Sequence, residues 1–150
     1  MPVSDEREDV LLLDVPQEGD YLSVLPTATA AVATRLGFSL DEIEDLRAAV
    51  NAAVGLLLPP DSARPRLLRG RTPPEPLRCR LEVGETCLQI VLSRPKGDPL
   101  PGDNTYQWQV LRALTDEVRS ETAGSVSTIS IRQRRPSTES DADTERHSLH

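Results

Sequence analysis

Aromatic residues are scarce in this chain of 150 residues, which has one phenylalanine, one tryptophan and two tyrosines. The hydrophobic core must therefore be built mainly from aliphatic side chains. The chain also lacks an apolar run of about 20 residues, the length needed to cross a membrane. Its first residues, MPVSDEREDV, are acidic and have no basic region before an apolar stretch, unlike a secretory signal peptide. We therefore expect one cytoplasmic domain with no contact to a membrane.

Basic charge is also limited, and the formal net charge is −7. Residues 1–20 hold seven acids and one arginine, and residues 136–150 hold four acids and one arginine. The middle of the chain is close to neutral, so it lacks the dense basic face of a protein that binds nucleic acid directly. The two polar ends show no apolar periodicity. We therefore predict disordered acidic segments at 1–9 and 136–150, around a single domain at 10–135.

Histidine and cysteine, two common metal ligands, are few as well, with two of each. The only histidines, His147 and His150, lie in the acidic tail without a nearby cysteine or a patterned acid. We interpret them as solvated side chains and expect no metal site. The stretch 61–76 is rich in arginine and proline and is predicted to be a solvated connector. Contact with an acidic partner, or with the acidic N-terminal segment of the same chain, is the alternative.

The clearest helical pattern runs from Leu40 to Leu57. Ser39 can cap this helix, and Glu42 stands three residues further on, which is the spacing of a capping box. Apolar residues then recur at intervals of three and four and predict a core-facing stripe: Ile43, Leu46, Val50, Ala53 and Leu57. A second stripe, spaced by four, consists of Ala48, Ala52 and Leu56.

A second helix is predicted over Tyr21–Leu36, where it closes at Gly37, a residue suited to a left-handed cap. Pro26 leaves two alternatives for its start. If Ser23 is the cap, the proline lies in the first turn and is tolerated, whereas a start at Asp20 requires a kink. Before this helix, the run Val10–Val15 is typical of a short buried strand.

Residues 77–92 predict a β-hairpin with a two-residue turn at Gly84-Glu85, in which glycine comes first as a type II′ turn prefers. This register pairs Val83 with Thr86 and places the apolar side chains on one face of the hairpin. Cys79 then points inward and Cys87 outward, so the two cannot form a disulfide with each other.

A third helix is predicted over Asp103–Val118, with Trp108, Leu111, Leu114 and Val118 on one stripe. A final strand follows at Val126–Ile131. The predicted order is therefore strand, helix, helix, hairpin, helix, strand. That order predicts an α+β fold, a two-layer sandwich with a mostly antiparallel sheet and helices on one face.

A family resemblance is found in three stretches that follow one another in this order: VPQEGDYLSVL, VATRLGFSLDEIEDLRAAVNAAV and QWQVLRALTDEVRSETAGSVSTISI. Together they resemble the anti-sigma factors of the GHKL (histidine-kinase-like ATPase) fold, over about residues 10–133. The actinobacterial anti-sigma-F type is the most similar, because its late helix also carries a tryptophan and ends in an acidic pair before a valine. Members of this family are serine-protein kinases that hold a sigma factor and phosphorylate an anti-anti-sigma partner of the STAS type.

The chain departs from this family at the residues that would bind and use ATP. The family's Leu40–Leu57 helix carries a glutamate that activates the attacking group and an asparagine that ligates magnesium, and Ala52 and Leu56 stand at those positions. The family also has an aspartate two residues before a glycine, and this aspartate binds the adenine amino group. If Gly97 is that glycine, Pro95 stands at the position of the aspartate. The glycine-rich segment before the third helix is missing around Gln107. We therefore expect no catalytic residue, no retained cofactor site and no bound cofactor.

The resemblance, together with these losses, implies an anti-sigma factor that binds and sequesters an alternative sigma factor without dependence on ATP. Release would come from a competing STAS protein or from another signal. Candidate contact residues lie along the first helix, where Pro26 stands in place of a family arginine: Tyr21, Leu22, Leu25, Thr29 and Arg35.

Two alternatives to this function stay open. One is a divergent serine kinase that binds ATP and magnesium in a rearranged way and acts on a STAS protein. The other is an interaction module without a sigma partner. A homodimer is also compatible with the family resemblance.

Overall fold

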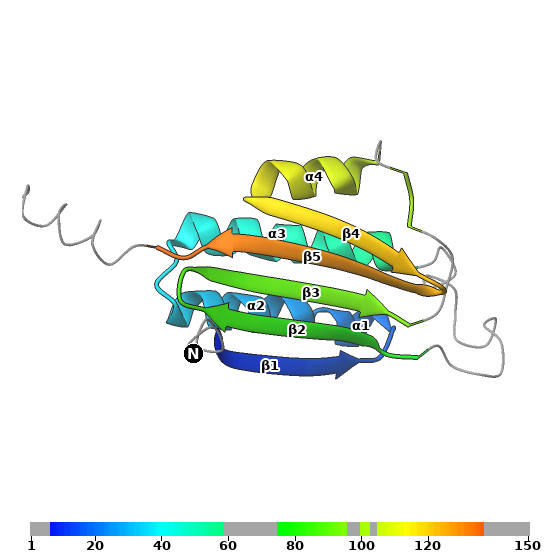
Figure 1. The fold of residues 1–150 in the computed structure, drawn as a ribbon, viewed down its shortest axis with the longest axis horizontal. Helices are drawn as coiled ribbons and strands as arrows, with labels where there is room; N and C mark the ends of the chain where they lie inside the picture. The colour runs from blue at the N-terminus through cyan, green and yellow to red at the C-terminus, as the bar shows by residue number, and fades with distance from the viewer. Residues whose placement is uncertain (1–6, 59–74, 96–99, 103–104, 137–150) are drawn as a thin grey trace, which may run out of the picture.

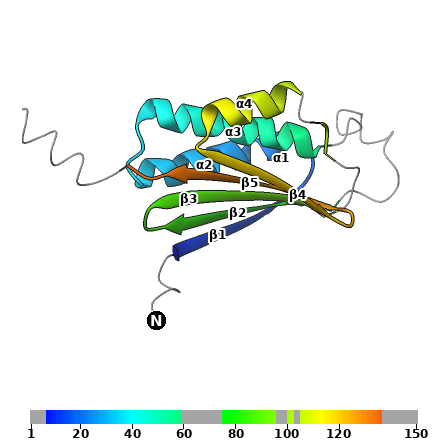
Figure 2. The ribbon, with the colours of Figure 1, turned by 45° about the horizontal axis from the view of Figure 1, so that its top comes forward.

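The computed structural model describes residues 7–58, 75–95, 100–102 and 105–136. Five strands form one antiparallel sheet in the order β1-β2-β3-β5-β4, and the helices lie together on one of its faces (Figures 1 and 2). This arrangement confirms the predicted two-layer α+β sandwich. In chain order the elements are β1 (Arg7–Val15), α1 (Gly19–Leu22), α2 (Val24–Arg35), α3 (Leu40–Leu57), β2 (Leu77–Gly84), β3 (Cys87–Arg94), α4 (Tyr106–Leu114), β4 (Glu117–Ala123) and β5 (Val126–Arg134).

The hydrophobic core fills the space between the helices and the inner face of the sheet. It is almost entirely aliphatic, as the scarcity of aromatic residues predicted. Its largest fully buried side chains are Leu25, Leu46, Leu56, Leu57, Leu77, Leu81, Leu88, Ile90, Leu92, Leu111, Ile129 and Ile131. Helix α3 packs against α2 on one side and α4 on the other. Among the described residues, no helix has both the length and the apolar character that a membrane span requires.

The predicted helix over Tyr21–Leu36 is interrupted. A single turn, α1, ends at Leu22, and α2 begins at Val24 after Ser23. Pro26 therefore lies in the first turn of α2, where the backbone N–H that it lacks would have no partner within the helix. At the other end, Gly37 adopts the predicted left-handed conformation with φ of +86°. The amides of Gly37 and Phe38 donate back to carbonyls of the last turn, which completes a Schellman-type cap.

The prediction that Val10–Val15 is a buried strand was wrong for most of its residues. β1 forms and begins at Arg7, but it lies at the edge of the sheet, next to β2 alone. Val10, Leu11 and Leu12 are 47, 41 and 57% exposed, and Val15 is buried. An apolar run of this length does not distinguish a central strand from an edge strand, because both can contain it.

The β2–β3 hairpin forms, but the predicted register was wrong by two residues. Val83 pairs with Leu88 instead of Thr86, and Gly84 lies within β2 without a positive φ. Arg135, just after β5, donates its backbone N–H to the carbonyl of Thr86 and its side chain to that of Gly84. These bonds tie the turn to a strand distant in sequence. A slip of two residues leaves every side chain on its predicted face.

The third helix is shorter than predicted, and one strand was not predicted. α4 ends at Leu114, so Val118 lies in β4 and not on a helical stripe. Thr115 turns to an extended conformation, with φ of −128° and ψ of 155°. Asp116 then bonds to β5 through its backbone N–H and its side chain. The predicted start of the helix at Asp103 lies outside the described residues.

Candidate functional site

Helix α3 is the scaffold on which the resemblance places the catalytic and magnesium-binding residues. Its N-terminus has the predicted capping box: Ser39 Oγ accepts from the amide of Glu42 at 3.2 Å, and Glu42 Oε1 accepts from the amide of Ser39 at 2.8 Å. The helix then runs unbroken to Leu57. Its frame therefore fixes which side chains face the core and which face α4.

Ala52 and Leu56 occupy the two family positions on α3, and both are buried. Ala52 is 9% exposed and Leu56 is 2% exposed, and both belong to the main hydrophobic core. Neither side chain carries an oxygen or nitrogen atom. This part of α3 therefore supplies neither a carboxylate for proton transfer nor an oxygen ligand for a hard cation.

Helix α4 covers the same part of α3. A Cβ atom built on Gly55 would lie 3.6 Å from Gln107 Nε2 and 3.7 Å from Gln107 Cγ. Gln107 comes from the segment in which the family has glycine-rich backbone, and here it lies in the first turn of α4. The resemblance places phosphate-binding amides in this region, and an amide side chain is instead packed over the backbone of α3.

The end of strand β3 lies beside the C-terminal end of α3, which α4 also covers. We call this meeting point of α3, α4 and β3 the corner. Pro95, at the position of the adenine-reading aspartate, is half-buried, and its carbonyl accepts from Ser125 Oγ at 3.3 Å. Gly97 lies outside the described residues. Arg94, one residue earlier, is 2% exposed. Its Nη1 donates to the carbonyl of Leu57 at the end of α3, and its Nη2 donates to Ser127 Oγ at 3.2 Å.

The described residues contain no cluster of three or more histidine, cysteine or acidic side chains that could hold a metal ion. His147 and His150 lie outside those residues. The predicted absence of a metal site stays a prediction for the whole chain.

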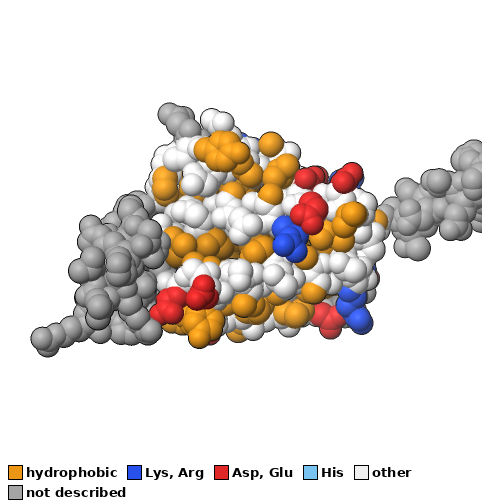
Figure 3. Space-filling view, turned by 180° about the vertical axis from the view of Figure 1, so that it is seen from behind, with side chains coloured by type: hydrophobic (Ala, Val, Ile, Leu, Met, Phe, Trp, Pro, Cys, Tyr) orange, Lys and Arg blue, Asp and Glu red, His pale blue; other side chains and the backbone are white. Residues whose placement is uncertain are grey.

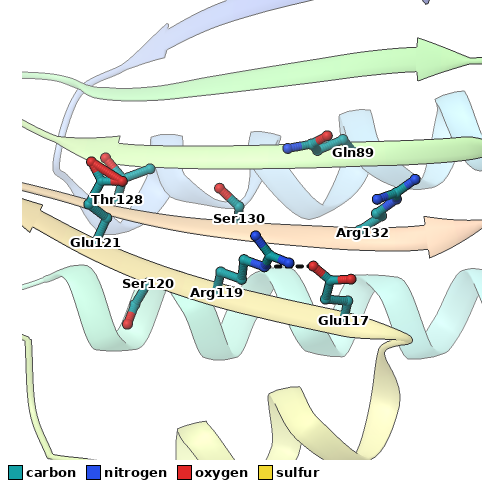
Figure 4. Close-up of a pocket in the computed structure, with 8 residues that line it drawn as sticks. All are labelled: Gln89, Glu117, Arg119, Ser120, Glu121, Thr128, Ser130 and Arg132. Atoms are coloured by element: carbon teal, nitrogen blue, oxygen red, sulfur yellow. Dashed lines mark ion pairs between the residues drawn. The ribbon is translucent and has the colours of Figure 1, made fainter. Parts of the chain in front are cut away.

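Among the described residues, shallow hollows of about 360 to 510 Å³ lie along the sheet and are lined by residues of the strands and the segments beside them. One of these, of about 360 Å³, lies across β3, β5 and β4 on the face opposite the helices (Figure 4). Its lining mixes arginines and glutamates with neutral polar groups, and Arg119 Nε pairs with Glu117 Oε2 at 2.7 Å. These features are typical of a solvated sheet face with compensated charges.

The five candidate contact residues on the first two helices differ in exposure. Tyr21 is 52% exposed and Arg35 is also exposed, whereas Leu22 packs partly against the core. Leu25 and Thr29 are fully buried, and Thr29 Oγ1 donates to the carbonyl of Leu25 at 2.9 Å. Burial therefore removes Leu25 and Thr29 from the surface that a partner could touch. Figure 3 shows the helical face, where apolar side chains lie among uncharged polar side chains and backbone, and charged side chains are few.

The two cysteines are free and lie on opposite faces of the hairpin, as predicted. Burial raises the pKa of the Cys79 thiol to about 12. Partial burial alone would also raise the pKa of Cys87. Hydrogen bonds from Arg132 Nε, at 3.3 Å, and from Thr86, together with nearby arginine charge, outweigh that effect and lower the pKa below its usual value.

The structure is thus an α+β fold in which a five-stranded antiparallel sheet packs against helices, with the capped helix α3 between α2 and α4. One solved structure to which the chain is similar is that of the RsbU and RsbW domains of Rv1364c from Mycobacterium tuberculosis. The TM-score is 0.62 with 10% sequence identity, over 87% of this chain and 34% of that chain. The match confirms the predicted fold.

Among curated sequences, the chain is similar to proteins named serine-protein kinase RsbW from Bacillus thuringiensis (strain Al Hakam) and Bacillus cereus (strain B4264). Each is 33% identical over 48 residues, which is 32% of this chain and 30% of the relative. The chain thus matches less than a third of the length of these relatives. No family model matches the chain. The resemblance predicted from the sequence is confirmed in fold over most of the chain and in sequence over this shorter stretch.

Sequence reasoning missed Arg94, although the sequence contains a signal for it. Leu88, Ile90 and Leu92 alternate along β3 and face the core. The same period places Arg94 on the inner face, where a charged residue requires partners. The predicted hairpin ends at Leu92, two residues before Arg94, so the alternation was not extended to this residue.

Proposed function

We propose that this protein is an anti-sigma factor that binds and sequesters an alternative sigma factor in the cytoplasm without a requirement for ATP. The observation that carries this proposal is the burial of Ala52 and Leu56 within an otherwise intact RsbW-type fold. A site that lacks a base and a metal ligand does not support phosphoryl transfer. The helical surface that could hold a partner is nevertheless formed.

The proposed contact surface is the exposed side of α1 and α2. Tyr21 and Val24 are 52 and 42% exposed, and Arg35 lies exposed at the other end of α2. Exposed aromatic and arginine side chains often supply much of the energy at protein interfaces. Leu25 and Thr29 support this surface from beneath, since both are buried. A STAS protein that covers the same surface would release the sigma factor by competition.

The free edge of β1 supports a homodimer as a further part of the proposal. Val10, Leu11 and Leu12 are exposed there, and an apolar strand edge is a template for pairing with another chain. Pairing of two copies along β1 would extend the sheet and shield part of Val10 and Leu12 on its outer face and of Leu11 on its inner face.

The second candidate function is a divergent serine kinase that acts on a STAS protein. The name of the curated relatives, serine-protein kinase RsbW, favours it. In that case Mg-ATP must bind the native protein and raise its unfolding temperature, as any ligand specific for the native state does.

The deciding experiment is a pull-down with tagged protein from lysate of the native host, washed with and without Mg-ATP, with bound proteins identified by mass spectrometry. Equal recovery of an alternative sigma factor in both washes is the expected result. Variants Tyr21→Ala and Arg35→Ala should each reduce that recovery, and Tyr106→Ala, an exposed aromatic residue on α4, serves as the control. Recovery that requires Mg-ATP would favour the kinase, and absence of any sigma factor from both washes would refute the anti-sigma function.

A further inference from the structure

Arg94 is a charged side chain enclosed by the core, and its contacts connect three elements. It ends β3, it bonds to the last carbonyl of α3, and it bonds to Ser127 at the start of β5. Ser127 is itself 1% exposed and is the cross-strand partner of Arg94. A planar guanidinium has several donors in a fixed fork, so one side chain can serve two acceptors in different directions.

The contact with Leu57 meets a need of helix α3. The last carbonyls of a helix have no partner within it, and together they carry a partial negative charge. The last turn of α3 has no basic residue of its own. Arg94 supplies this positive charge from the sheet. Because the contact is almost excluded from water, solvent screens it weakly.

The position of the contact matters as much as its chemistry. Leu57 follows Leu56, the family's magnesium position, and Arg94 precedes Pro95, the family's adenine-reading position. The bond between Arg94 and the carbonyl of Leu57 therefore joins the direct sequence neighbours of two positions that the family resemblance assigns to the ligand. Ser125 Oγ adds a further link from the β4–β5 turn to Pro95.

We propose that Arg94 is an internal cation that holds the C-terminal end of α3 on the sheet, next in sequence to two positions at which the family resemblance places ligand contacts. The helical layer is thereby organised without a ligand. This inference rests on the proposed nucleotide independence, but it concerns the isolated protein and is tested without any partner.

The test uses three substitutions and a matched control. Arg94→Ala removes the cation, Arg94→Met keeps the length of the side chain without the charge, and Arg94→Lys keeps a point charge without the fork. The control is Arg78→Ala, an exposed arginine of β2 on the opposite face that pairs with Asp14 at 2.9 Å. We expect Arg94→Ala and Arg94→Met to lower the unfolding temperature by roughly 10 °C, because a buried carbonyl and hydroxyl lose their partner. Arg94→Lys should lie between these variants and the wild type, and Arg78→Ala should stay close to it.

Chemical rescue separates an internal cation from mere packing. Ethylguanidinium at low millimolar concentration should restore part of the lost unfolding temperature of Arg94→Ala and leave the wild type and Arg78→Ala unchanged. Ethylammonium should restore less, because it lacks the fork. Rescue by Mg-ATP, or an Arg94→Met protein as stable as the wild type, would overturn the proposal.

A measurement on the unmodified protein keeps the proposal testable if the variants do not fold. Nitrogen-15 spectra of the arginine side chains should show slowly exchanging Nη protons for Arg94, because it is nearly unexposed and bonded at both Nη atoms. Fast exchange of all arginine Nη protons would refute the contact. Failure of the pull-down would leave this result unaffected, so the two proposals fail separately.

Discussion

Replacement of Leu56 by asparagine introduces the side chain that the resemblance places at this position, and the structure predicts that it destabilises the fold. Leu56 is 2% exposed and lies within the main core. Loss of a buried leucine side chain costs about 2–5 kcal/mol in comparable substitutions to alanine. The asparagine fills part of that volume, but it brings an amide without a partner into an apolar site, at about 1–3 kcal/mol.

We therefore expect Leu56→Asn to lower the free energy of unfolding by about 3–6 kcal/mol. The upper end of this range is below the sum of the two costs because the asparagine side chain fills part of the space that the leucine leaves. Leu56→Met serves as the control, because a swap that conserves apolar volume should cost less than about 1.5 kcal/mol. Domains of this kind typically have a stability of about 5–15 kcal/mol, so the asparagine variant is expected to be marginal but measurable.

The assay is urea unfolding followed by far-UV circular dichroism and by the fluorescence of Trp108, the only tryptophan. Trp108 is 4% exposed in α4, next to α3, and its indole Nε1 donates to the carbonyl of Pro101 at 3.0 Å. Its emission therefore reports on the packing of these two helices. A loss below about 1 kcal/mol for Leu56→Asn would refute the reasoning, because that is less than the cost of one unpaired buried amide. Such a result would mean that the position opens to water.

Three further predictions follow from the caps and the thiols. Ser39→Ala should cost about 1 kcal/mol of unfolding free energy in urea titrations, since it removes half of the capping box of α3. Gly37→Ala should cost roughly 1–2 kcal/mol in the same assay, because φ is +86° and no neighbouring atom lies within 4 Å, so the cost arises in the backbone alone. At pH 7.5, iodoacetamide should alkylate Cys87 in the native protein and Cys79 only after unfolding. Arg132→Met should slow the alkylation of Cys87, because loss of the hydrogen bond raises the pKa of its thiol and reduces the thiolate fraction.

The elements with strong local signals were predicted well from the sequence. Helix α3 matches its predicted bounds, since its capping box and stripe lie within the helix itself. Gly37 adopts the predicted conformation for a similar reason. The faces of the hairpin were also correct, because alternation of apolar and polar residues decides them.

The features that sequence reasoning missed depend on contacts between distant residues. The register of the hairpin is set by Arg135, about 50 residues after the turn it contacts, and no local pattern contains that information. β4 was not predicted because its residues are mostly polar and exposed. Gly124, in the turn between β4 and β5, has φ of +64° and was the local signal for a hairpin there. Within the candidate site, the apolar character of Ala52 and Leu56 follows from the sequence, and the role of their positions stays a prediction from the resemblance. The contact between Arg94 and the end of α3 required the fold.

Three features meet at the end of α3, and together they bear on whether this region could bind a nucleotide. Leu56 is buried in the core, Gln107 packs over Gly55, and Arg94 bonds to the carbonyl of Leu57. Reversion of Leu56 alone leaves the guanidinium and the amide side chain in place, so it should lower stability without producing nucleotide affinity. Recovery of affinity would require changes on α3, β3 and α4 together. Under the proposed function, control of the partner surface on α1 and α2 must therefore come from competition at that surface and not from turnover at this corner.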